Sequence, residues 1–132
     1  MARGRTWALA PARAIPKDEQ DALRQRLEKH ISHRWKRWCR SLVPSFRGRF
    51  AYVDALPAQR WYMPGTTREQ RAMIDATPVR LCRLEYVRSG DRWRYAFFKY
   101  SNEKYAPSVV ASGSFMATPE QAFDSAARVY LR

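Results

Sequence analysis

The sequence predicts an α+β fold with a long N-terminal amphipathic helix, an antiparallel sheet of three to four strands and a C-terminal helix. Three observations support this class. Apolar residues recur at helical spacing over residues 18–42, and a helix-capping motif begins at Thr118. Between them, the segments 49–56, 79–88 and 92–100 are rich in aromatic and β-branched residues, as strands are. Helices at both ends of a run of strands are typical of an α+β domain.

Residues 1–17 are expected to form a flexible basic arm, because they hold four basic residues, no acid and two prolines. The apolar stretch around Trp7 is too short for a secretory signal and is interrupted by Pro11. No apolar run approaches the ~18–20 residues that cross a bilayer, so we expect no membrane span and a cytoplasmic location. Residues 18–132 fit a single domain, since a chain of 132 residues with 45% hydrophobic composition can bury a core.

The helix expected over residues 18–42 has one apolar and one basic side. Its apolar side is formed by Leu23, Leu27, Ile31, Trp35, Trp38, Cys39 and Leu42. Its opposite side carries Arg26, Lys29, His33, Lys36, Arg37 and Arg40. Pro44 follows the expected end of the helix. The basic side is a candidate surface for a phosphate backbone, and an ordinary solvated surface is the alternative.

After this helix we expect a strand at 49–56, an insert at about 57–78, strands at 79–88 and 92–100, and a short fourth strand at 105–111. The insert is either a loop or a short helix. Pro107 would place the fourth strand at an edge of the sheet, because proline cannot donate a ladder hydrogen bond. The last helix begins with Thr118 as N-cap, Pro119 as its first residue and Gln121 closing a capping box.

The charge balance points to an anionic partner. The chain carries 25 Lys and Arg against 12 Asp and Glu, a net charge of +13. This balance favours nucleic acid, and an acidic protein or a bias in composition are the alternatives. Arginine is the predominant cation, and it binds phosphate bidentately and stacks on bases and aromatic rings.

The strand at 92–100 carries aromatic residues on both faces. One face would hold Trp93, Tyr95, Phe97 and Lys99, and the other Arg94, Ala96, Phe98 and Tyr100. If helices cover only one face, the other shows rings among cations, which is how proteins stack single-stranded bases. The alternative is a central strand whose second face meets a partner subunit or the insert.

Two segments resemble the signatures of RNA-recognition-motif domains. Residues 95–100 (YAFFKY) look like the second half of the longer signature, and residues 51–56 (AYVDAL) are similar to the shorter one. This resemblance implies that Tyr52, Tyr95 and Phe97 stack on bases. The two residues before Tyr95 depart from the family pattern of a basic residue and a glycine.

Two further resemblances cover more of the chain. The order helix, three strands, helix is similar to that of the double-stranded-RNA-binding domain, although the helix at Thr118 lacks that family's phosphate-binding lysines. Over about residues 46–131, the runs LCRLEY, RWRYAFFKYSNEKY and ATPEQAF look like a family of small uncharacterised bacterial proteins. That resemblance implies a bacterial origin and brings no activity with it.

Enzymatic chemistry finds little support in the sequence. There is no glycine-rich phosphate loop, no nucleophile elbow and no carboxylate pair of defined geometry. The chain is similar in class to small basic ribonuclease toxins, which cleave RNA without a fixed motif, and this alternative stays open. Cys39 and Cys82 predict neither a disulfide framework nor a zinc site, so we expect no metal and no cofactor.

The sequence therefore predicts a non-enzymatic accessory protein that binds RNA or single-stranded DNA. The alternatives are a subunit that docks an acidic protein or a nucleoprotein complex, and the ribonuclease. The residues expected at the nucleic-acid interface are Arg26, Lys29, His33, Lys36, Arg37, Arg40, Arg47, Arg49, Tyr52, Arg92, Trp93, Tyr95, Phe97 and Lys99. The oligomeric state stays open.

Overall fold

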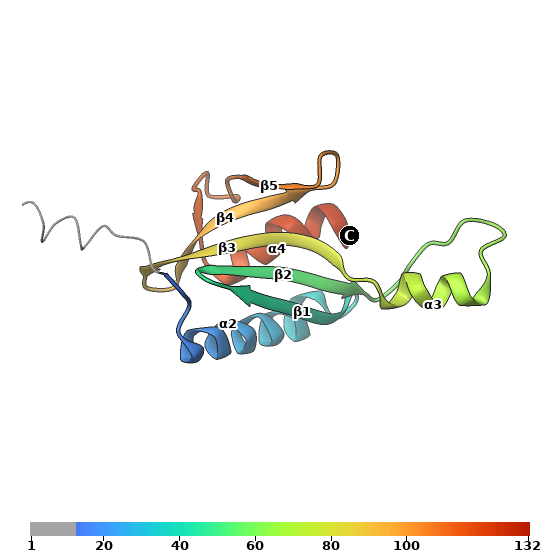
Figure 1. Cartoon of the computed structure of the whole chain (residues 1–132), viewed down its shortest axis with the longest axis horizontal. Coiled ribbons are helices and arrows are strands. Elements are labelled where there is room, and N and C mark those ends of the chain that lie inside the picture. The colour runs from blue at the N-terminus through green and yellow to red at the C-terminus, as the bar shows by residue number, and fades with distance from the viewer. Residues whose placement is uncertain (1–12) are drawn as a thin grey trace, which may run out of the picture.

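A computed structural model describes residues 13–132, in which helices pack against one antiparallel sheet (Figure 1). The elements in chain order are α2 (Lys17–His30), the π-helical turn η1 (Ile31–Trp35), β1 (Cys39–Arg47), β2 (Phe50–Pro57), α3 (Arg68–Ala76), β3 (Val79–Ser89), β4 (Arg92–Lys99), β5 (Lys104–Pro107), β6 (Met116–Ala117) and α4 (Pro119–Tyr130). The predicted α+β class and its helix–strands–helix order are confirmed.

The sheet has the strand order β1-β2-β3-β4-β5, and β6 pairs with the first residues of β4. All pairs are antiparallel. α2 and α4 lie on the same face of the sheet (Figure 1). The sheet is larger than the three to four strands expected, because residues 39–47 and 116–117 also pair with it.

The strands predicted at 49–56, 79–88 and 92–100 are confirmed as β2, β3 and β4. The strand expected at 105–111 is the shorter β5, which lies at the edge that Pro107 predicts. α4 begins as predicted. The Thr118 hydroxyl accepts a hydrogen bond from the Gln121 backbone N–H, and the Gln121 side chain accepts one from the Thr118 N–H.

The N-terminal helix is shorter than the sequence predicts. It continues through η1, and the chain turns back where the Trp38 N–H donates to the Trp35 carbonyl oxygen at 2.9 Å. Cys39 and Leu42 therefore belong to β1, and the prediction of a helix to residue 42 was wrong because the four-residue apolar spacing continues through the turn. Pro44 lies within β1, where it is tolerated because β1 is an edge strand.

The insert is a loop followed by the short helix α3. The Thr67 side chain caps this helix by accepting from the Gln70 N–H at 3.1 Å. No residue of α3 is buried, and the segment projects beyond the ends of β2 and β3 (Figure 1). We call residues 58–78 the α3 arm.

The core lies between the two long helices and the sheet. α2 and η1 contribute Leu23, Leu27, Ile31 and Trp35 to it, so the apolar side predicted for this helix holds as far as residue 35. The Trp35 indole N–H and the His30 ring both bond to Asp124 of α4 at 2.7 Å. These bonds tie the N-terminal and C-terminal helices together on one face of the sheet.

The basic arm expected at residues 1–17 lies mostly outside the described residues. Its end is part of the fold, contrary to expectation. Ile15 is buried in the core, and its N–H donates to the Gly48 carbonyl oxygen at 3.0 Å. Lys17 then begins α2.

Candidate nucleic-acid interface

The sheet has one face covered by helices and one open face. Residues alternate between them, and Ala51, Val53 and Ala55 of β2 point into the core. The antiparallel register extends this assignment to the neighbouring strands. The open face is therefore formed by Ser45, Arg47, Phe50, Tyr52, Asp54, Arg80, Arg83, Glu85, Arg94, Ala96, Phe98 and Tyr105.

The structure corrects the predicted interface on β4. Trp93 and Tyr95 are only 3% and 1% exposed and belong to the core. Phe97 is half-buried and stacks on the Tyr130 ring of α4, with 5.2 Å between ring centroids and 13° between planes. These three rings cannot stack on bases, because α2 and α4 cover the face to which they point. Burial also raises the pKa of Tyr95 to about 12.

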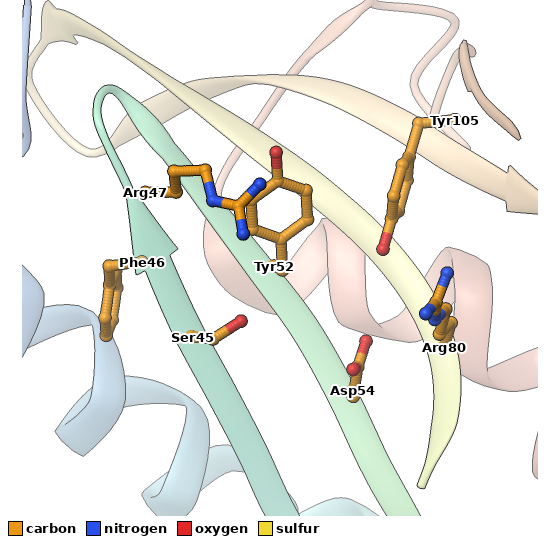
Figure 2. Close-up of a pocket in the computed structure, with 7 residues that line it drawn as sticks. All are labelled: Ser45, Phe46, Arg47, Tyr52, Asp54, Arg80 and Tyr105. Carbon is orange, nitrogen blue, oxygen red and sulfur yellow. The ribbon is translucent and has the colours of Figure 1, made fainter.

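A pocket of about 330 Å³ lies on the open face and is lined by Ser45, Phe46, Arg47, Tyr52, Asp54, Arg80 and Tyr105 (Figure 2). These residues come from β1, β2, β3 and β5. The Tyr52 and Tyr105 rings meet edge to face, with centroids 5.5 Å apart. The pocket thus combines three aromatic rings, two guanidinium groups and one carboxylate.

Arginines lie directly on the rings of the open face. The Arg83 guanidinium carbon is 4.5 Å from the Phe50 ring centroid and 5.4 Å from that of Tyr105. Arg80 lies 5.3 Å from the centroid of Phe98, whose ring is buried under its neighbours. Such cation–π contacts hold arginine side chains against the sheet surface.

The two acids of the open face differ in their surroundings. Glu85 accepts hydrogen bonds from Arg49 at 2.8 Å and from Arg94 at 3.3 Å. Asp54 has a buried Oδ1 to which no described residue donates a hydrogen bond. Burial raises the pKa of Asp54, and the charge of Arg80 opposes this only in part. Tyr105 has a pKa raised to about 12 by burial and, less strongly, by the charge of Asp54.

The basic side predicted for the N-terminal helix is not one continuous surface. Arg26 donates two hydrogen bonds to Glu120 at 2.8 and 2.6 Å and lies 3.7 Å from Asp91, so internal acids already neutralise it. Arg40 belongs to β1 and donates to the Asp75 carbonyl oxygen at 2.7 Å. Arg40 leaves the predicted surface because the helix ends early, and Arg26 because it pairs with an acid of α4. Of the six residues predicted for this side, Lys29, His33, Lys36 and Arg37 stay exposed along the helix and the turn that follows it.

The remaining predicted residues divide between the open face and the rim of the sheet. Arg47 and Tyr52 line the pocket, as the prediction requires. Arg49 lies beside them and is bound to Glu85. Arg92 and Lys99 are exposed at the two ends of β4.

Several residues of the open face were missed from the sequence: Phe50, Asp54, Arg80, Arg83 and Tyr105. The alternation of small apolar residues with Tyr52 and Asp54 along β2 was a usable signal, because it identifies the inward set of that strand. Extending it to Arg80, Arg83 and Tyr105 required the strand pairing, which is known only from the structure.

In residues 13–132, no group of three or more His, Cys, Asp and Glu side chains is placed to hold a metal ion. Cys39 and Cys82 are buried free thiols, and burial raises the pKa of Cys39 to about 11. Among the described helices, none is long and apolar enough to cross a membrane.

No protein-family model, no curated protein and no solved structure matches this chain. The resemblances to RNA-recognition-motif and double-stranded-RNA-binding domains therefore stay predictions from the sequence.

Proposed function

We propose that this protein binds single-stranded nucleic acid, RNA or DNA, on the open face of its sheet without catalysing a reaction. The observation that carries the proposal is the mixture of rings and arginines on this uncovered face. Phe50, Tyr52 and Tyr105 lie among Arg47, Arg80 and Arg83 there. Every base has a π-face, so an aromatic surface bordered by cations suits a single strand of any sequence.

The net charge of +13 supports the same proposal. Exposed cations outside the open face, such as Lys36 and Arg37, extend the positive field around it. If about six phosphates are neutralised, the logarithm of the binding constant should fall against the logarithm of salt concentration with a slope of roughly −4 to −5.

The test is a titration of labelled single-stranded RNA, single-stranded DNA and duplex at two salt concentrations, followed by fluorescence anisotropy. We expect a single strand to bind more tightly than the duplex, and salt to weaken both. Tyr52→Ala and Tyr105→Ala should each weaken single-strand binding by about 1–3 kcal/mol. Phe115→Ala is the matched control, because Phe115 is 54% exposed and belongs neither to the open face nor to the α3 arm.

Three outcomes would contradict the proposal. A salt slope near zero would exclude the electrostatic contribution, and equal affinity for heparin and every nucleic acid would reduce the binding to charge alone. Tyrosine variants with unchanged affinity would exclude the open face. The labelled RNA should be intact after the titration, since cleavage would favour the ribonuclease alternative.

A second candidate function is supported by the α3 arm. Trp61, Met63 and Met73 are 78%, 68% and 71% exposed and surround a hollow of about 390 Å³. The arginines Arg68 and Arg71 are exposed on the same short helix. An apolar surface bordered by cations fits an apolar segment of an acidic protein, and the charge of +13 disfavours a second copy of this chain.

This second candidate is tested with a labelled peptide that forms a glutamate-rich amphipathic helix. Binding should raise the fluorescence anisotropy of the labelled peptide when the native chain is added, and this rise should be lost with the double variant Trp61→Ser with Met73→Ser. Equal binding by the native chain and the double variant would exclude the α3 arm as the docking surface.

A further inference from the structure

The Asp54 carboxylate is the group of the open face whose hydrogen bonding the described residues do not complete. It lies on β2, between β1 and β3, and lines the pocket with Tyr52 and Tyr105 (Figure 2). Its Oδ1 atom is buried, and no described residue donates a hydrogen bond to it. Buried polar atoms in folded proteins nearly always have a partner, so we expect the carboxylate to turn towards the pocket, where a ligand that brings its own donors would satisfy it.

The surroundings of Asp54 restrict the chemistry of that ligand. In the described part of the chain, neither Arg47 nor Arg80 is engaged in an ion pair, so both can meet an anion. The Tyr52 and Tyr105 rings provide an aromatic wall. A fitting ligand therefore has N–H donors, an aromatic ring and a phosphate. A nucleotide of a nucleic-acid strand has all three.

We propose that this pocket binds the guanine base of a single-stranded nucleic acid, with Asp54 as the residue that selects it. Guanine alone among the four common bases presents two adjacent donors, the N1–H and the exocyclic amino group, on its Watson–Crick edge. An ionised carboxylate accepts both at once. A guanidinium beside the carboxylate, as Arg80 is, can donate to O6 on the same edge.

The other bases fit this arrangement less well. Adenine and cytosine each present one donor beside a ring-nitrogen acceptor, and uracil presents one donor between two carbonyl oxygens. A ring nitrogen or carbonyl oxygen placed opposite the Asp54 carboxylate repels that carboxylate. One carboxylate oxygen then has no hydrogen-bond donor. A good bidentate contact discriminates against the wrong base by about 1–3 kcal/mol, which corresponds to about 5- to 150-fold in affinity.

The inference rests on the proposed function, and the ligand itself supplies the first test. The probes are ten-nucleotide oligouridylates with guanosine, inosine, adenosine, cytidine or uridine at one central position. Inosine lacks the exocyclic amino group and keeps the N1–H. We expect the guanosine probe to bind about 5- to 150-fold more tightly than the uridine probe, with inosine between them.

The second test changes the protein. Asp54→Asn replaces one acceptor oxygen with a donor, so the preference for the guanosine probe should fall to near one-fold while binding of the uridine probe is kept. Glu69→Gln is the matched control. It removes one acidic charge from an exposed site on α3, and the guanosine preference should be unchanged.

The outcomes separate the two proposals. If the native chain binds all five probes equally and with a salt dependence, the guanine inference is wrong and the proposed function stands. If none of the probes binds, the proposed function fails. If guanosine monophosphate displaces the guanosine probe as effectively as the unlabelled oligonucleotide does, the ligand is a free nucleotide and not a strand.

Discussion

Both faces of the sheet carry aromatic side chains, but helices cover only one of the two faces. On β4, Trp93 and Tyr95 are buried under α2 and α4, whereas Arg94 on the other side of the same strand is exposed. On β2, the inward residues are the small Ala51 and Ala55, and the rings point to the open face. Aromatic content therefore does not distinguish the face that forms the core from the face that stays open.

The two faces differ in their charged residues, although both carry aromatic side chains. The helix-covered face contains no buried charged residue within residues 13–132. The open face carries Arg47, Arg80, Arg83 and Arg94 against the acids Asp54 and Glu85. A charge placed under a helix would lose its hydration without compensation, so cations collect on the side that water reaches.

The largest expected difference between the faces is in folding stability. Tyr95→Ala removes a buried ring, and we expect it to lower the free energy of unfolding by about 3–5 kcal/mol. Tyr52→Ala removes one ring of an edge-to-face pair on the open face, worth roughly 0.5–1.5 kcal/mol. Urea denaturation of both variants measures the difference. Equal losses would mean that Tyr52 also lies in a packed core.

The next effect is on nucleic-acid binding. The double variant Arg47→Glu with Arg80→Glu alters the open face, and Arg37→Glu with Arg40→Glu alters cations outside it. Each should make the salt slope shallower by roughly 1.4 to 1.8, because two phosphate contacts are lost. The first pair should weaken single strands more than duplex, whereas the second should weaken all nucleic acids alike. Titrations at two salt concentrations check this, and identical behaviour of the two variants would remove the distinction between the surfaces.

A smaller expected effect concerns how two acids, one on each side of the sheet, contribute to folding stability. Burial opposes the charged form of Glu120, but its hydrogen bond and ion pair with Arg26 outweigh burial, and its pKa is lowered. The pKa of Asp54 is raised by burial. At neutral pH the ionised form of Glu120 therefore stabilises the fold, whereas the ionised form of Asp54 destabilises it.

The two acids give stability differences of opposite sign. At pH 7, Glu120→Gln should unfold more easily than the native chain, and Asp54→Asn less easily. As the pH falls through the carboxyl range, the native Glu120 loses its contribution and the native Asp54 loses its penalty. Both differences should therefore shrink towards zero between pH 7 and pH 3. Thermal unfolding across this range checks the signs, and a destabilised Asp54→Asn at pH 7 would contradict the account of Asp54.

The smallest expected effect is on the α3 arm. Met73 is 71% exposed and α3 buries no residue. Met73→Ser should therefore change the free energy of unfolding by less than about 0.5 kcal/mol. A larger loss in urea denaturation would show that the arm supports the sheet.

Part of the site could be predicted from the sequence. Arg47 and Tyr52 were expected at the interface, and both line the pocket. Tyr95 was expected there as well and lies in the core, because alternation groups residues into two sets without saying which set meets the helices. Arg26 was expected to be free, but its partner Glu120 lies 94 residues further along the chain.

The sequence by itself determined the local features of this protein. The strands of the central sheet, the capped α4 that begins after Thr118, and the net charge of +13 all follow from residue types and their spacing. Only the tertiary structure decided where the first helix ends, which face of the sheet stays open, and that Asp54 lies in a pocket there. The physical reason is that capping and periodicity depend on neighbours in the chain. Burial, ion pairing and strand register depend on contacts between residues far apart in the sequence.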